Sequence, residues 1–227
     1  MASSEKKQLV IFGAGGHAKS VISVIHDEGL WDVVGLVTDN HGHVVKAVMD
    51  YPVFQGREHL LRLFSDGVKH AFIAVGDDSF RQKISPQLKE LGFELVNIIH
   101  PTALVMSGAM LEDGILLHAY SLVGAESKIA SGVIIQPYVS IGHESHIGAY
   151  SQLSPGARVG GDCRIGTCCF LGPNAVVFPK VSIGDFVSIG ANSTVNKDVP
   201  DHQTILSKAT RMISKSINKR SADENQI

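Results

Sequence analysis

A period of six residues dominates the sequence from Ile99 onward and constrains the fold more than any other feature. Every sixth residue from 99 to 195 is Ile, Val or Leu, over seventeen consecutive positions without a miss. A small or β-branched residue follows each of them four positions later, and Gly often follows directly, as at Gly124 and Gly142. An uninterrupted hexapeptide period of this length indicates a parallel β-helix.

The period also predicts how the β-helix is built. Three hexapeptides complete one triangular coil, so residues 18 apart stack on one face, with strands about 4.8 Å apart. The aliphatic residues face inward, and the small residues beside them, including Cys163 and Cys169, belong to the core. We expect the glycine after the aliphatic residue to supply the backbone angles of the sharp corners.

The first hundred residues have a different pattern, in which short apolar runs alternate with helical spacing. We expect strands at 9–12, 33–37, 52–54, 70–75 and 93–98, and helices at 18–28, at 58–64 and from about 79 to 91, with Ser79 as a cap. Such alternation favours a parallel sheet with right-handed crossovers. The predicted organisation is an α/β half-Rossmann-like domain at 1–98, a β-helix at 99–204 and a tail at 205–227 with weak helical character.

Composition excludes several classes of protein. Hydrophobic residues make up 44% and charged residues 19%, which suits a folded chain rather than a disordered one. The net charge of −2 gives no basic excess for nucleic acid or anionic membranes. No apolar run approaches the roughly 20 residues of a membrane span. The N-terminus shows no signal peptide, and the three cysteines form no disulfide framework or zinc spacing, so we expect a cytoplasmic protein with reduced thiols.

A glycine-rich turn follows the first expected strand and opens the first expected helix. Residues 13–18 fit the pattern Gly-x-Gly-x-x-Ala of dinucleotide-binding turns, and Asp39 fits the ribose-binding acid. About 98 residues provide only one mononucleotide-binding half, which is too little for NAD and enough for a nucleoside diphosphate. Here the turn and helix start would accept the pyrophosphate, Asp39 or Asn40 the ribose or base, and His17 could donate to phosphate or sugar. A tight turn without a ligand remains the alternative.

The predicted substrate-binding residues of this region are Gly13, Gly15, Gly16, His17, Asp39 and Asn40.

The β-helix carries a candidate general base at His143. It is the third residue of its repeat, so its side chain should point outward, and Glu144 could orient the imidazole. One coil later, Gly161 places a backbone N–H beside the same edge, where an oxyanion on a thioester carbonyl could be stabilised. An outward histidine on a β-helix can also be a plain surface residue. His146, at the next outward position, has the weaker claim to a direct role.

A zinc hydratase of the carbonic anhydrase type is an alternative use of such a prism. That chemistry needs three converging histidines. His118 and His143 are 25 residues apart, which is not a multiple of 18, and His143 and His146 are only three apart. We therefore expect no metal. His118 instead stacks between His100 and Gln136 as part of a polar row on one face.

The whole chain resembles a known family through four local matches: 11–18, 74–77 with Arg81, 142–148 and 154–157. Residues 195–200 also match the usual end of the prism. These segments are similar to left-handed β-helix acyltransferases, and the domain order resembles bacterial sugar O- and N-acetyltransferases of the sialic-acid and bacillosamine pathways. The resemblance implies an acetyl-CoA-dependent N-acetyltransferase that modifies an amino group, at C4, of a nucleotide-linked amino sugar in surface glycan biosynthesis.

The resemblance also implies roles for individual residues and an assembly. It gives Gly161 the same oxyanion role, places Pro173 and Ala191 at the coenzyme, and places Gly76 and Gln136 at the acceptor. It implies a C3 homotrimer with coenzyme grooves between neighbouring prisms. O-acetylation of a sialic acid and a non-catalytic structural trimer remain alternatives.

The chain departs from the family pattern in two places. The family usually has Gly-x-Pro-Ala after the prism, where this chain has residues 207–210, Ser-Lys-Ala-Thr. Relatives often have a histidine where this chain has Gln152, so no second base is expected there.

Overall fold

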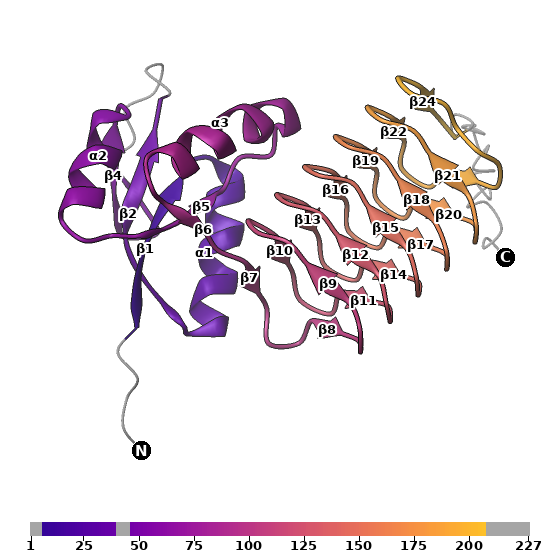
Figure 1. The fold of residues 1–227 in the computed structure, drawn as a ribbon, viewed down its shortest axis with the longest axis horizontal. Coiled ribbons are helices and arrows are strands. Elements are labelled where there is room, and N and C mark those ends of the chain that lie inside the picture. Colours follow the sequence, from indigo (N-terminus) through magenta and orange to yellow (C-terminus); the bar gives the residue numbers. More distant parts are fainter. Residues whose placement is uncertain (1–5, 40–45, 208–227) are drawn as a thin grey trace, which may run out of the picture.

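The computed structural model describes residues 6–39 and 46–207, which form an α/β lobe followed by a triangular prism of stacked coils (Figure 1). The coils run from β7, beside α1, to β24 at the far end of the prism (Figure 1). Within these two ranges, no helix combines the length and the apolar character that crossing a membrane would require.

The lobe is built around a mostly parallel sheet with the strand order β3-β4-β2-β1-β5-β6. Its elements are β1 (Lys7–Phe12), α1 (Gly16–Glu28), β2 (Trp31–Thr38), β3 (Ala47–Val48), β4 (Tyr51–Gln55), α2 (Glu58–Ser65), β5 (His70–Ile73), α3 (Asp78–Glu90) and β6 (Glu94–Leu95). The apolar residues at helical spacing in α1, including Val21, Ile22 and Ile25, are fully buried. The chain goes from β1 outward to β2 and β4, then returns to β5 on the other side of β1. This reversal creates a crevice at the carboxyl ends of β1 and β5, where ligands bind in open α/β sheets.

Three details of the lobe differ from the sequence prediction. The short strand β3 pairs antiparallel with β4, so the sheet is not wholly parallel. The expected single strand at 93–98 is two strands, because β6 pairs in the lobe whereas β7 (Ile98–Ile99) pairs in the prism. The cap of α3 is Asp77 rather than Ser79, since the Asp77 carboxylate accepts the Phe80 N–H at 2.6 Å.

The prism has three parallel sheets, which we call sides 1, 2 and 3. Side 1 contains β7 (Ile98–Ile99), β10 (Leu116–Leu117), β13 (Ile134–Ile135), β16 (Gln152–Leu153), β19 (Phe170–Leu171), β22 (Ser188–Ile189) and β24 (Thr204–Ile205). Side 2 contains β8 (Leu104–Val105), β11 (Leu122–Val123), β14 (Ser140–Ile141), β17 (Arg158–Val159), β20 (Val176–Val177) and β23 (Thr194–Val195). Side 3 contains β9 (Met110–Leu111), β12 (Lys128–Ile129), β15 (His146–Ile147), β18 (Arg164–Ile165) and β21 (Ser182–Ile183).

Stacked strands pair at the predicted interval of 18 residues, as in Leu122 with Ser140 and Ser140 with Arg158. The predicted left-handed β-helix of hexapeptide repeats is therefore confirmed. From Leu117 to Val195, every aliphatic residue of the six-residue period is at most 4% exposed. Val105 is 36% exposed because it belongs to the first coil, which has no coil beneath it. Cys163 and Cys169 lie in the core as expected.

The role expected of the glycine after each aliphatic residue is wrong. The corner residues with a left-handed backbone lie two positions further along, for example Glu126 and Glu144, with φ of 58° and 56°. Gly142 is needed for a different reason, since a Cβ there would lie 2.5 Å from the Gly161 backbone nitrogen of the next coil. Close stacking of the coils, not corner geometry, excludes a side chain at this position.

The lobe packs on side 1 of the first coils. The outward residues of β7, β10 and β13 belong to the same apolar cluster as the inner face of α1: Ile98, Leu116 and Ile134. Polar contacts border this cluster, including Lys89 of α3 with Asp113 at 2.5 Å. Side 1 is thus covered by its own lobe near the amino end of the prism.

The predicted polar row of His100, His118 and Gln136 follows the 18-residue register, and its two histidines face this junction. His118 Nε2 lies 2.8 Å from the hydroxyl of Ser20 on α1, and His100 Nε2 lies 3.2 Å from Asp27. Burial, followed by the nearby His100, lowers the pKa of His118. His118 therefore serves lobe docking.

The end of the prism extends slightly beyond the expected tail boundary. Thr204 and Ile205 form β24 and pair with β22, so Ile205 is in a strand rather than in the weakly helical segment. The remainder of that segment, from 208, lies outside the described residues.

Candidate active site

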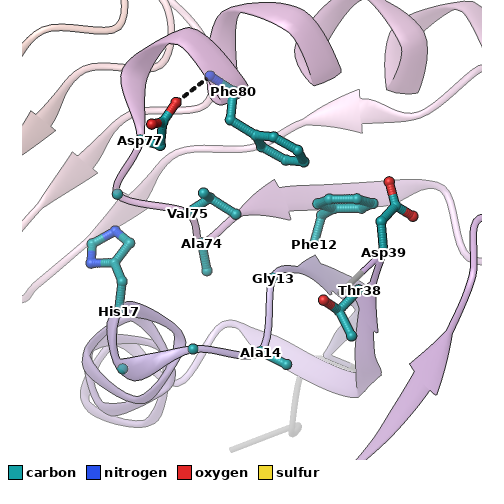
Figure 2. Close-up of a pocket in the computed structure, with 13 residues that line it drawn as sticks. Phe12, Gly13, Ala14, His17, Thr38, Asp39, Ala74, Val75, Asp77 and Phe80 are labelled. Carbon is teal, nitrogen blue, oxygen red and sulfur yellow. Dashed lines mark hydrogen bonds between the residues drawn. The ribbon is translucent and has the colours of Figure 1, made fainter. Parts of the chain in front are cut away.

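A cavity of about 620 Å³ lies at the carboxyl ends of β1, β2 and β5. Figure 2 shows its lining, with the start of α1 below and the turn that leads to α3 above. The described residues predicted to bind the acceptor in the lobe all line it: Gly13, Gly15, Gly16, His17, Asp39 and Gly76. Asn40 lies outside the described residues.

The glycines of the first turn have different tasks. Gly13 has φ +112°, a Cβ there would lie 2.7 Å from the Ala74 carbonyl oxygen, and its N–H donates to Val37. Gly13 therefore shapes the turn rather than contacting a ligand through its N–H. Around Gly15 and Gly16, a Cβ would meet no atom within 4 Å, so these two border open space.

The start of α1 is suited to an anion. Gly15 occupies the N-cap and supplies no capping side chain, and the first turn contains no acidic residue. The first N–H groups of a helix have no partner within the helix and carry a partial positive charge. A phosphate at this position would satisfy them.

His17 points from the start of α1 toward the segment that leads to Asp77 (Figure 2). Its Nε2 atom is buried and has no hydrogen-bond partner among the described residues. Burial, together with the charge of Arg81 and the nearby His118, lowers the pKa of His17 to about 4. His17 is therefore neutral at pH 7, and its Nε2 keeps one unused hydrogen-bonding capacity.

Asp39 closes the other end of the cavity beside two aromatic rings. The rings of Phe12 and Phe80 stack with their centroids 5.9 Å apart. Arg57 Nε donates to the Asp39 carboxylate at 2.5 Å, and Arg57 also donates to Gln87. This ion pair fixes the orientation of the carboxylate at the end of β2. No spacing pattern in the sequence pointed to Arg57, which is the N-cap residue of α2.

The prism presents a second group of predicted residues on the edge between sides 2 and 3. The imidazole of His143 and the carboxylate of Glu144 are bonded, with Nδ1 2.8 Å from Oε2, and both side chains are mostly exposed. If Nδ1–H donates to Glu144, Nε2 keeps its lone pair and can accept a proton.

Gly161 lies against the free side of that imidazole, because a Cβ there would be 2.6 Å from His143 Nε2. The Gly161 N–H donates to no acceptor among the described residues. The structure therefore brings His143, Glu144 and Gly161 together, with an unused backbone donor beside the ring.

The other predicted prism residues lie elsewhere. Pro173 and Ala191 stack on the edge between sides 1 and 2, where Asn192 N–H donates to the Pro173 carbonyl at 2.8 Å. Gln136 begins the same edge, half-buried after β13. His146 is on side 3, and Arg164 donates to its Nδ1 at 2.8 Å.

In one chain these groups do not meet. The His143 edge lies opposite side 1, which the lobe covers, so the lobe cavity and His143 are on opposite sides of the prism. Pro173 and Ala191 are separated from His143 by the width of side 2. The described residues contain no group of three His, Cys, Asp or Glu side chains placed to hold a metal ion.

Both halves of the chain match known protein families. Residues 8–88 match the family described as the PglD N-terminal domain, and 144–179 and 162–197 match the bacterial transferase hexapeptide of six repeats.

Solved structures cover nearly the whole chain. PerB from Caulobacter crescentus, in complex with CoA and GDP-perosamine, is 33% identical over 91% of this chain and 97% of that one, with a TM-score of 0.84. A histidine-to-asparagine mutant of perosamine N-acetyltransferase from the same organism, with the same ligands, is 32% identical over 91% and 96%, with a TM-score of 0.65. The acetyltransferase domain of PglB from Neisseria gonorrhoeae, in complex with acetyl coenzyme A, is 29% identical over 89% and 97%, with a TM-score of 0.81.

Proposed function

Since the chain belongs to the hexapeptide-repeat acyltransferases that carry a PglD-type N-terminal domain, we propose that it is an acetyl-CoA-dependent N-acetyltransferase of a nucleotide-linked amino sugar. The acetylated group is the amine at C4, and the product is a precursor of a surface glycan. The solved relatives hold CoA or acetyl coenzyme A, and two of them hold GDP-perosamine, a nucleotide-linked amino sugar.

The arrangement of His143, Glu144 and Gly161 is the observation that carries this proposal. Acetyl transfer forms a C–N bond and breaks the C–S bond of the thioester, and the amine must lose a proton. His143 Nε2 receives this proton, while Glu144 at Nδ1 holds the ring and stabilises its charged form. The N–H of Gly161 donates to the oxyanion, and the missing side chain leaves room for the thioester.

The lobe cavity binds the nucleotide part of the acceptor in this proposal. The uncapped start of α1 takes the diphosphate, and Asp39 accepts from the ribose or base with a carboxylate that Arg57 holds in place. His17 and Gly76 lie nearer the sugar, and Gln136 contributes from the prism. Gly161, Pro173 and Ala191 line the coenzyme groove.

A homotrimer would bring these separated groups together. Because one chain leaves the lobe cavity and His143 on opposite sides of its prism, the site is incomplete without a second copy. In a C3 trimer, a neighbouring prism can place its Pro173 edge against the His143 edge. We expect a trimeric mass by light scattering at micromolar concentration, and a monomeric mass would contradict this assembly.

Turnover of a substrate panel tests the function. Purified protein is incubated with acetyl-CoA and, in separate reactions, UDP-, GDP- or dTDP-linked 4-amino sugars or a sialic acid, and CoA release and product mass are followed. We expect one of these sugars to gain a single acetyl group on nitrogen. Acetylation of a sialic acid hydroxyl instead would favour the O-acetyltransferase, and a protein that does not bind acetyl-CoA would be the structural trimer.

A further inference from the structure

Arg81 is a buried cation at the junction of lobe and prism, and the mechanism above does not use it. It projects from α3 and is 2% exposed. Nη1 donates to the carbonyls of Val75 at 3.1 Å and Gly76 at 2.6 Å. Nε donates to the carbonyl of Gly132 at 3.2 Å, and Nη2 donates to that of Tyr150. Every partner is thus a backbone carbonyl, two in the lobe and two in the prism.

Burying a guanidinium between two domains costs more desolvation free energy than apolar packing does. Desolvating a charge costs free energy, and even buried ion pairs can often be replaced by apolar residues of similar volume without loss of stability. Burial lowers the pKa of Arg81 to about 10, against the opposing effect of Asp78, so the side chain stays charged at neutral pH. The neighbouring cluster of Ile98, Leu116 and Ile134 already supplies apolar docking. The charge and the four donors of Arg81 therefore serve a purpose beyond adhesion.

The bonds of Arg81 fix the direction of two peptide groups that line the cavity. In a trans peptide, the N–H of the next residue points opposite to the carbonyl. Because the Val75 and Gly76 carbonyls face Arg81, the N–H groups of Gly76 and Asp77 face away from it. Neither N–H donates to an acceptor among the described residues, and both residues line the cavity.

We propose that Arg81 is a positioning residue for the acceptor site: it holds the turn 74–77 with the Gly76 and Asp77 N–H groups toward the nucleotide sugar, and anchors this turn to the prism coils at Gly132 and Tyr150. This inference rests on the proposed function of the lobe. The charge of Arg81 also lies near the carboxylates of Asp77 and Asp78, and so weakens their repulsion of a diphosphate.

Substitution of Arg81 separates positioning from docking. Arg81→Lys keeps the charge, but one ammonium cannot reach carbonyls on both sides of the junction. Arg81→Met removes all four hydrogen bonds with little change in volume. Lys89→Met is the matched control, because it removes the ion pair of the same helix with Asp113 and leaves the turn alone.

Nucleotide and coenzyme affinities are measured by calorimetry with UDP, GDP and dTDP, and with CoA. For the nucleotide that wild type binds best, we expect Kd to rise at least ~10-fold in both Arg81 variants, as for the loss of hydrogen bonds to a charged group. CoA affinity should stay within about twofold, as should both affinities in Lys89→Met. A lower Tm with unchanged nucleotide Kd in Arg81→Lys would make Arg81 a structural clamp and overturn the inference.

Two further results keep the test decisive. If wild type binds none of the three nucleotides, the proposed function of the lobe fails, and the inference fails with it. If the Arg81 variants do not fold, amide hydrogen exchange of wild type replaces them. Saturating nucleotide should then slow exchange at Gly76 and Asp77, and unchanged exchange at both amides would overturn the inference.

Discussion

The prism and the lobe hold their functional residues in different ways. On the prism, His143 and Glu144 project from an outer edge, with side chains 66% and 59% exposed, above a core formed by other residues of the repeat. In the lobe, Gly13 and the turn 74–77 line the cavity, and the same residues determine how the lobe folds and docks. Chemistry and stability should therefore be separable on the prism, whereas binding and stability are coupled at Gly13 and the turn 74–77 of the lobe.

The largest effect on activity is expected at the prism edge. His143→Ala should lower kcat/KM by ~10²–10⁴-fold, the usual cost of losing a general base. Thermal stability should not change, because the exposed imidazole leaves no cavity in the core. Steady-state kinetics and a thermal melt of the same preparation measure both quantities.

Two neighbouring variants check the assignment of His143. Glu144→Ala should lose less activity, since it removes the group that orients the base and not the base itself. His146→Ala should be near neutral. If His143→Ala kept more than roughly half of the wild-type turnover while His146→Ala lost nearly all of it, His146 rather than His143 would be the general base.

Gly161→Ala should have the next largest effect. The added Cβ would lie 2.6 Å from His143 Nε2, so the imidazole must move. Displacement of a catalytic group by about 1 Å can cost ~10²-fold, and we expect a loss of kcat/KM of roughly 10- to 100-fold. Ala125 occupies the same corner position two coils earlier, which indicates that the backbone tolerates a Cβ there.

A double mutant distinguishes displacement of the imidazole from direct obstruction of the thioester. In a His143→Ala background, Gly161→Ala has no imidazole to displace, so it should add little to the loss. Equal costs in both backgrounds would mean that the Cβ obstructs the thioester directly rather than the base.

The difference between the two regions also explains what the sequence could predict. In the prism, the identity of each inward residue follows a local six-residue rule. The pairing interval of 18 residues and the burial of the aliphatic residues of the period from Leu117 to Val195 could therefore be predicted from the sequence. The proximity of His143 to Gly161 followed from the same interval. The glycine role was wrong because the period shows where glycine occurs but not which contact requires it. Close approach of the next coil is a property of the stacked structure.

In the lobe, the elements were predictable and their long-range contacts were not. The helices appear where apolar spacing placed them, but the division of 93–98 between two sheets depends on docking to the prism. The motif containing Arg81 was recognisable in the sequence. Its four carbonyl partners could not be predicted, because every residue has a backbone carbonyl and residue type does not show which of them accepts a hydrogen bond.

A smaller effect, on binding alone, is expected from two lobe substitutions that spare the fold. Gly15→Val should fill open space at the start of α1, where a Cβ meets no atom within 4 Å, and so block the diphosphate. Asp39→Ala removes a polar contact to ribose or base. We expect each to weaken nucleotide-sugar binding by ~10-fold or more, with unchanged acetyl-CoA affinity. Calorimetry that shows both ligands weakened equally would make the lobe a scaffold rather than the acceptor site.

The smallest effect is expected on the pH dependence of stability, and it arises from the buried histidine of the lobe. Burial lowers the pKa of His17 from 6.5 to about 4. Between these two pH values the unfolded chain binds a proton at His17 and the folded chain does not, so the free energy of unfolding falls as the pH is lowered. Above pH 6.5 both states are neutral at this position and no loss is expected.

His17→Gln should therefore lose less stability than wild type between pH 7 and pH 5, because it removes one group that must stay unprotonated in the folded lobe. Urea midpoints at the two pH values measure this, and the comparison with wild type cancels titrating groups that are common to both proteins and distant from His17. Ser23→Ala, an exposed and non-titrating position on the same helix, is the matched control and should keep the wild-type pH dependence. If His17→Gln lost as much stability on acidification as wild type, His17 would take up its proton in the folded state without cost. The lobe cavity would then be more hydrated around this ring than the burial of Nε2 indicates.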